Sequence, residues 1–103
     1  MTVIGIGQLR SYTRAYVERA RSGETFQVLR RGRPVARLQA VQDGVGVPVP
    51  LADLRTRPAQ VFDRIAAGAT VLVTYRGHNV ATLRPLADLE GREPSAPSPL
   101  PTP

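Results

Sequence analysis

The feature that most constrains the fold of this chain is an internal repeat. Residues 1–40 (the first copy) align without a gap with residues 46–85 (the second copy) when the sequence is shifted by 45 positions. Eleven of the forty aligned pairs are identical, which indicates duplication of one unit rather than chance similarity. The identical pairs are Leu9/Leu54, Arg10/Arg55, Arg19/Arg64, Gly23/Gly68, Thr25/Thr70, Val28/Val73, Arg31/Arg76, Gly32/Gly77, Val35/Val80, Ala36/Ala81 and Leu38/Leu83. The two copies are therefore expected to have the same fold.

Each copy begins with the same predicted elements. An extended run (residues 2–6 or 47–51) precedes a helical stretch, whose apolar residues recur at helical spacing. This spacing assigns to the buried face Leu9, Tyr12, Tyr16 and Ala20, and in the second copy Leu54, Val61, Phe62 and Ile65. Gly23 and Gly68 are expected to end the stretch, because glycine adopts the left-handed conformation of a helix end most easily. Pro58 predicts a short helix followed by a longer one, since proline fits the first turn of a helix but not its interior.

Two runs rich in β-branched residues complete each copy. They are expected at residues 25–30 and 34–40 in the first copy, and at 70–75 and 79–84 in the second. Arg31-Gly32-Arg33 and Arg76-Gly77-His78 join them, with glycine able to take the positive φ that a tight hairpin requires. The predicted fold class is α+β: two tandem β-α-α-β-β units form a single-chain pseudo-dimer with a shared antiparallel sheet and helices on it.

The length of the unit predicts how the chain is organised. A unit of about forty residues buries too little apolar surface to fold alone, so the two copies are expected to share one core. Large and small residues trade places between Tyr16, Val17, Ala20 and Val61, Phe62, Ile65, as either complementary packing or drift after duplication would produce. We expect a first unit at residues 1–41, a linker at 42–46 and a second unit at 47–90. A disordered, proline-rich tail is expected at 91–103.

The charge of the chain favours an anionic partner. The net charge is +6, and all fourteen basic residues are arginine. Nucleic acid is the commonest anionic partner of a small basic protein. The use of arginine rather than lysine is better explained by a GC-rich genome than by DNA binding. Residues 1–45 carry a net charge of +5 and residues 46–91 only +1. We therefore expect the first copy to dominate nonspecific attraction to DNA.

Several function classes are disfavoured. The chain has no cysteine, no apolar run near the ~20 residues of a membrane span, and no secretory signal at its start, so we expect a cytoplasmic protein. His78 is the only histidine, and the G-x-G of residues 5–7 lacks the third glycine of a dinucleotide site. We expect no enzymatic activity, no cofactor and no metal.

The order of these motifs, found twice, carries a family resemblance. The run IGIGQLRSYTRAYVERARSGETFQVLRRGRPVARL (residues 4–38) has a short strand leading into a Leu-Arg pair, an amphipathic helix closing on a small residue plus Gly, a strand, an Arg-Arg-Gly-x-Pro turn and a Val-Ala-x-Leu strand. It resembles the N-terminal domain of the Phd/YefM antitoxin family. VPLADLRTRPAQVFDRIAAGATVLVTYRGHNVATL (residues 49–83) is similar too, with Tyr75 and Asn79 in place of the Arg and Pro of the turn.

The resemblance implies a function and partners. Members of that family form dimers that bind double-stranded operator DNA and repress their own operon, and a C-terminal segment neutralises a cognate toxin. In this chain the second copy stands where the toxin-binding segment would begin. The resemblance therefore implies a single-chain pseudo-dimer that binds operator DNA, with a toxin as a second possible partner; further self-association is left open.

The resemblance also places the DNA contacts at the start of the helical region and at the hairpin turn. The matching residues are Arg10, Ser11, Arg14, Arg31 and Arg33 in the first copy, and Arg55, Thr56, Arg57 and Arg76 in the second. The residue types suit the task, because helix N-termini bind phosphates, guanidinium groups bind guanine edges, and arginines at a hairpin tip grip the backbone. Arg19 and Arg21 are interpreted as solvated surface charges, and Tyr12 and Tyr16 as core.

Three functions remain in competition. The first is a DNA-binding, antitoxin-like transcriptional regulator. The second is a protein-interaction module that binds or neutralises a toxin-like partner without DNA. The third is an RNA-binding protein, which competition between duplex DNA and structured RNA would distinguish.

Overall fold

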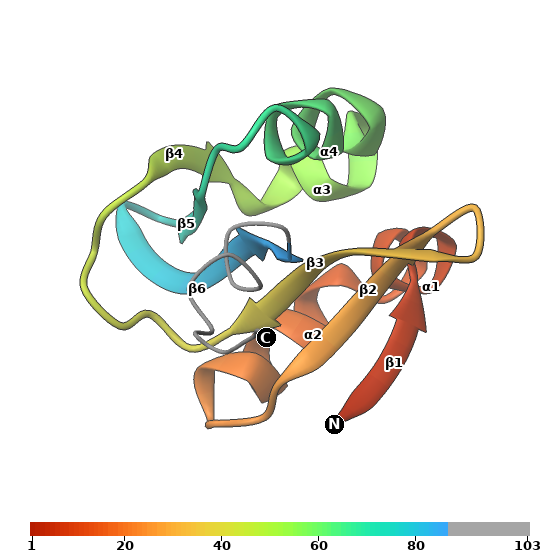
Figure 1. Ribbon diagram of the computed structural model, residues 1–103. Helices are drawn as coiled ribbons and strands as arrows, with labels where there is room; N and C mark the ends of the chain where they lie inside the picture. Colours follow the sequence, from red (N-terminus) through yellow and green to blue (C-terminus); the bar gives the residue numbers. More distant parts are fainter. Residues whose placement is uncertain (87–103) are drawn as a thin grey trace, which may run out of the picture.

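The repeated β-α-α-β-β order predicted from the sequence is confirmed. The computed structural model describes residues 1–86 (Figure 1). Its elements are β1 (Thr2–Gly5), α1 (Ile6–Ser11), α2 (Thr13–Arg21), β2 (Phe26–Arg30), β3 (Arg33–Gln39), β4 (Val47–Pro50), α3 (Leu51–Thr56), α4 (Pro58–Ala66), β5 (Val71–Tyr75) and β6 (His78–Pro85). The proline-rich tail expected at 91–103, and the last residues of the second unit, lie outside the described residues.

The six strands of residues 1–86 form one sheet, in the order β1-β2-β3-β6-β5-β4. The two copies meet at its centre, where β3 and β6 pair antiparallel. In this pair Leu38 lies opposite Leu83, which is its own repeat counterpart. A local twofold axis therefore passes between these two leucines, and the chain is a single-chain pseudo-dimer.

The sheet is mixed, which corrects the expectation of an antiparallel sheet. The four central strands β2, β3, β6 and β5 pair antiparallel, but β1 pairs parallel with β2 and β4 pairs parallel with β5. The reason lies in the connections, because each outer strand is followed by two helices before its partner begins. A crossover of that length returns the chain to the same end of the sheet, where the next strand runs parallel.

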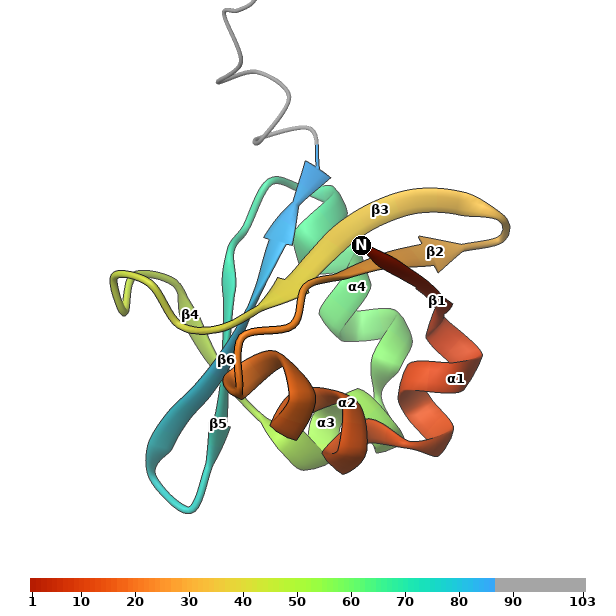
Figure 2. The same cartoon turned by 90° about the horizontal axis from the view of Figure 1, so that it is seen from below.

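The helices cover one face of this sheet. Both longer helices, α2 and α4, contact the central strands β3 and β6, while α1 contacts α3 (Figure 2). The buried apolar residues of both copies form a single cluster beneath them. Its members are Ile4, Leu9, Val17, Ala20, Phe26, Val28, Ala36, Leu38, Val49, Leu51, Leu54, Val61, Phe62, Ile65, Val71, Val73, Val80, Ala81 and Leu83. Within residues 1–86, no helix is long and apolar enough to cross a membrane.

The break predicted before Pro58 is confirmed, and it occurs in both copies. Pro58 is the first residue of α4, and Arg57 before it has φ −137°. In the first copy Tyr12 leaves the helix at φ −128°, although no proline follows it. The break is thus a property of the repeated unit and does not require proline. Pro58 is compatible with it because proline fits the first turn of a helix.

The break also explains why one core prediction is wrong. Tyr12, assigned to the buried face, is 66% exposed. The helical spacing does not run through the break, so Thr13 takes the buried position, and its hydroxyl donates to the Leu9 carbonyl oxygen at 2.7 Å. Tyr16 is half-buried, and its ring packs edge-on against Phe26 at a centroid separation of 5.3 Å.

The exchange of large and small residues extends from the helices to the strands. The first copy has Ala20 on α2 and Phe26 on β2, whereas the second has Ile65 on α4 and Val71 on β5. All four side chains are fully buried. The exchange keeps the summed side-chain volume of the two positions similar in the two copies, and cores tolerate substitutions that conserve volume best.

Candidate nucleic-acid interface

Both hairpin tips present an arginine in a strained backbone conformation. Arg31 and Gly32 have φ of 55° and 77°, and Arg76 and Gly77 have φ of 50° and 81°. Positive φ at both central residues is the pattern of a type I′ turn, which matches the twist of the flanking strands. Glycine adopts this conformation freely, but arginine does not. The structure therefore holds an exposed, strained arginine at the same place in both copies.

Two grooves related by the local twofold axis lie beside these hairpins. The first groove, about 580 Å³, is lined by residues 5–8, residues 29–32 and the start of α4. The second groove, about 460 Å³, is lined by residues 50–52, Arg55, residues 74–77 and Arg14 of α2. Each groove thus combines the hairpin and first helix of one copy with the second helix of the other copy.

The second groove brings together three of the arginines singled out from the sequence. Arg14, Arg55 and Arg76 all line it and all are exposed, and among residues 1–86 no carboxylate lines it. Tyr75 lies among them, with its ring centroid 5.1 Å from Cζ of Arg14 and 5.2 Å from Cζ of Arg76. Both separations are within the range of cation–π attraction.

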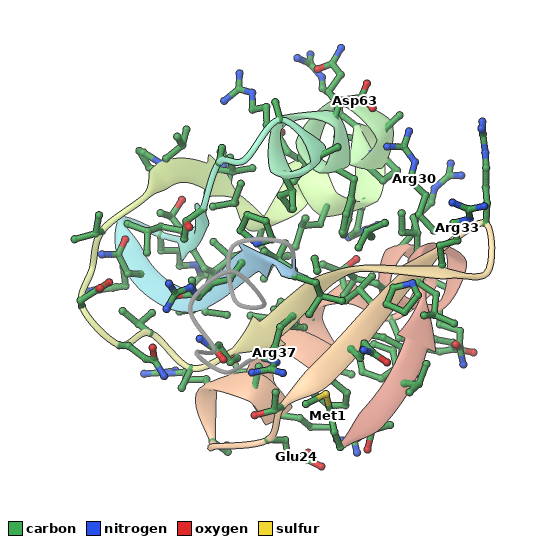
Figure 3. The ribbon with its side chains drawn as sticks, viewed as in Figure 1. Met1, Glu24, Arg30, Arg33, Arg37 and Asp63 are labelled. Carbon is green, nitrogen blue, oxygen red and sulfur yellow. The ribbon has the colours of Figure 1, made fainter. Side chains whose placement is uncertain are left out.

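The first groove carries less uncompensated charge. Arg30 and Arg31 line it, but Arg30 Nη1 lies 2.9 Å from Oδ1 of Asp63 on α4 (Figure 3). Ala59 lines this groove at the repeat position of Arg14. The first half of the sequence is the more basic one, yet its Arg14 contributes to the groove of the second hairpin. Charge counted along the chain therefore does not give the charge of each groove.

Arg10 and Arg55 lie where the two copies meet. The Arg10 Nε donates a hydrogen bond to the backbone carbonyl of Arg55 at 3.2 Å, which joins α1 to α3. Both arginines, with Ser11 and Thr56, belong to the last turn of their six-residue helices rather than the first. The argument from helix N-termini therefore does not apply to them, because they stand at the C-terminal ends of α1 and α3. The Thr56 hydroxyl donates to the Ala52 carbonyl at 3.0 Å.

Three other candidates are placed differently. Arg31 is at the first hairpin tip and lines the first groove. Arg33 is exposed at the start of β3. Arg57 is exposed immediately before α4, where it lines a third, smaller hollow. Neither Arg33 nor Arg57 is among the lining residues of the two hairpin grooves.

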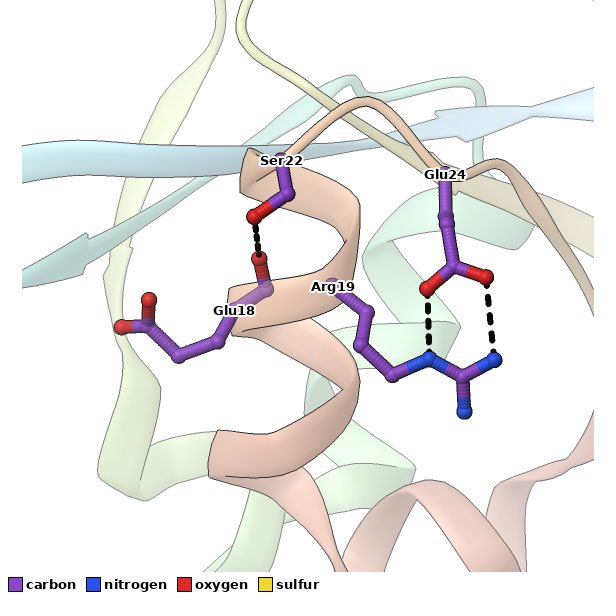
Figure 4. Close-up of polar contacts among 4 residues, drawn as sticks. All are labelled: Glu18, Arg19, Ser22 and Glu24. Carbon is purple, nitrogen blue, oxygen red and sulfur yellow. Dashed lines mark hydrogen bonds and ion pairs between the residues drawn. The ribbon is translucent and has the colours of Figure 1, made fainter.

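Arg19 is engaged in an ion pair away from the grooves, in agreement with its interpretation as a surface charge. Its Nε and Nη2 donate to the two carboxylate oxygens of Glu24 (Figure 4). This hydrogen bonding lowers the pKa of Glu24 and raises that of Arg19. Arg21, also exposed, has Nη1 3.9 Å from Oε1 of Glu18.

The sequence did not predict that the Tyr75 ring would lie beside two arginines. Tyr75 occupies the repeat position that Arg30 holds in the first copy, which indicated that the two hairpins differ. Nothing in the sequence indicated that Arg14, sixty-one positions earlier, would contact it.

Neither a metal-binding group within residues 1–86 nor a similar protein adds to the description of this site. Within residues 1–86, no cluster of three or more His, Cys, Asp or Glu side chains is arranged to hold a metal ion. Comparisons with family models, with curated proteins and with solved structures find no match to this chain.

Proposed function

We propose that the protein is a duplex-DNA-binding, antitoxin-like transcriptional regulator that acts in the bacterial cytoplasm and represses its own operon. The observation that carries this proposal is the pair of arginine-bearing grooves related by the local twofold axis. Proteins with twofold symmetry bind DNA sites whose half-sites are related in the same way. The resemblance to Phd/YefM antitoxins, which rests on the repeated motifs, supports the same function.

The residue chemistry divides into two kinds of contact. Arg31 and Arg76 at the hairpin tips are suited to phosphates, which fix the position of the protein on the duplex. Arg10 and Arg55, exposed near the meeting point of the copies, are suited to guanine O6 and N7 in the major groove. The net charge of +6 favours the approach of a polyanion.

Fluorescence anisotropy tests this function directly. The labelled duplexes are the region upstream of the protein's own gene and a scrambled duplex of equal composition. Arg10→Ala and Arg55→Ala should each weaken specific binding by about 1 to 3 kcal/mol and relax base preference in opposite half-sites. Arg21→Ala is the matched control, because it removes one exposed charge at the end of α2, outside both grooves, and should change affinity little.

Two results would contradict the proposal. Equal affinity for the upstream and scrambled duplexes would exclude a sequence-specific regulator and leave protein interaction as the leading function, to be tested by copurification with the neighbouring gene product. Wild-type affinity in both arginine variants would show that the contact surface lies elsewhere.

A further inference from the structure

We propose that Tyr75 is a positioning residue that holds Arg14 and Arg76 as a clamp for one DNA phosphate in the second groove. This inference rests on the proposed DNA-binding function and names the place where the duplex backbone is anchored. The ligand chemistry is a phosphodiester, and the clamp is assembled from both copies of the repeat.

The geometry around the Tyr75 ring supports its role in positioning the two arginines. Arg14 comes from α2 of the first copy and Arg76 from the hairpin of the second, and their guanidinium carbons lie 5.1 and 5.2 Å from the centroid of Tyr75. Both arginine side chains are exposed, whereas Tyr75 is half-buried and packs against the core. A flexible arginine loses rotamer freedom when it binds, so an arginine already held against an anchored ring loses less.

The charge of the second groove supports an anionic ligand. Arg55 adds a third guanidinium, and no acidic residue of the described part of the chain lines the groove. Guanidinium groups form forked, charge-assisted hydrogen bonds with phosphate oxygens. Arg14 and Arg76, beside the positive charge of Arg55 and with no carboxylate from residues 1–86 lining the groove, favour an anion over a neutral ligand.

The first groove serves as an internal comparison. At the repeat position of Tyr75 it has Arg30, which is paired with Asp63, and at that of Arg14 it has Ala59. It therefore holds no clamp of this kind. The second groove, rather than the hairpin of the more basic first copy, should dominate the salt dependence of binding.

The experiment measures affinity for a scrambled duplex by anisotropy at several salt concentrations. Tyr75→Leu removes the aromatic face without changing charge, and should lower affinity about three- to fivefold at low salt. It should also lower the slope of log K against log salt by about one unit, as expected for one lost phosphate contact. Tyr75→Phe keeps the face and should bind as the wild type does. Arg14→Gln should reproduce the loss of slope without touching the core.

Tyr16→Leu is the matched control. Tyr16 also holds an arginine near its ring, with Cζ of Arg19 5.8 Å from the centroid, but that arginine is engaged by Glu24 outside the grooves. This variant should leave both affinity and salt slope unchanged. Thermal unfolding of each variant separates loss of the clamp from loss of the fold, and Arg14→Gln supplies the result if Tyr75→Leu does not fold.

Two outcomes would overturn the clamp while leaving the proposed function intact. One is wild-type affinity and slope in both Tyr75→Leu and Arg14→Gln. The other is binding by Tyr75→Phe as weak as by Tyr75→Leu, which would assign the effect to the hydroxyl. If the wild type binds no duplex, the proposed function itself is wrong and the clamp is rejected with it.

Discussion

At the scale of single residues, the hairpin tips show a conflict between local preference and charge. Type I′ turns favour Asn, Asp or Gly at the position held by Arg31 and Arg76, because these residues tolerate positive φ. Both copies instead carry arginine there. Backbone strain that persists at exposed positions is typical of sites where the side chain has a function, here the proposed contact with DNA.

Arg31→Asn should therefore stabilise the fold and weaken DNA binding. The free energy of unfolding is expected to rise by about 1 kcal/mol, because asparagine visits the left-handed region at lower cost. Urea denaturation measures the stability, and anisotropy with a scrambled duplex measures the loss of affinity. Arg33→Asn is the control for stability, since Arg33 lies in β3 and is not among the residues with positive φ. An unchanged or lower stability of Arg31→Asn would show that the turn is not strained.

At the scale of elements, the helix–strand contacts of the two copies fill their space differently. The ring of Phe26 packs against Tyr16 on α2, one turn before the buried Ala20. In the second copy the larger residue, Ile65, is on the helix and the smaller one, Val71, is on the strand. A close-packed interior senses such differences, because an unfilled volume loses contacts on all its walls.

Phe26→Val should destabilise the protein by about 2 to 4 kcal/mol through the cavity that it leaves. Adding Ala20→Ile reproduces the combination of the second copy and should recover part of that loss, because the added side chain refills the space. Denaturant unfolding of the wild type, the single variants and the double variant measures the coupling. Strict additivity of the two substitutions would show that these positions do not share a space.

At the scale of the whole molecule, the linkage of the two copies replaces dimerisation. The central β3–β6 pair and the shared core join residues of both copies within one chain. An obligate homodimer of such units would gain stability with protein concentration, whereas an intramolecular pair does not. The covalent link also ensures that the two grooves are always present together on one molecule.

Melting midpoints measured over a hundredfold range of protein concentration should therefore coincide. The physical reason is that folding requires no encounter between chains. Calorimetry or circular dichroism measures the midpoint, with light scattering as the check for association. A midpoint that rises steadily with concentration would show that chains must pair to fold.

The sequence by itself determined the order of the elements, the helix break before Pro58, the glycine-containing hairpins and the pairing of two copies. These features depend on the local preferences of proline and glycine, on hydrophobic spacing, and on a repeat too short to fold alone. They are encoded within a few residues or in the repeat itself. For this reason they were predictable without knowledge of distant neighbours.

Only the tertiary structure decided which side chains meet. It exposed Tyr12, because the helical spacing is interrupted at the break, and it made the outer strand pairs parallel, because each crossover contains two helices. It also placed Arg14 beside Tyr75 and Arg76 of the other copy, although the arginines were identified from the sequence. Such contacts follow from the packing of both copies about the local twofold axis, which no local pattern of residues specifies.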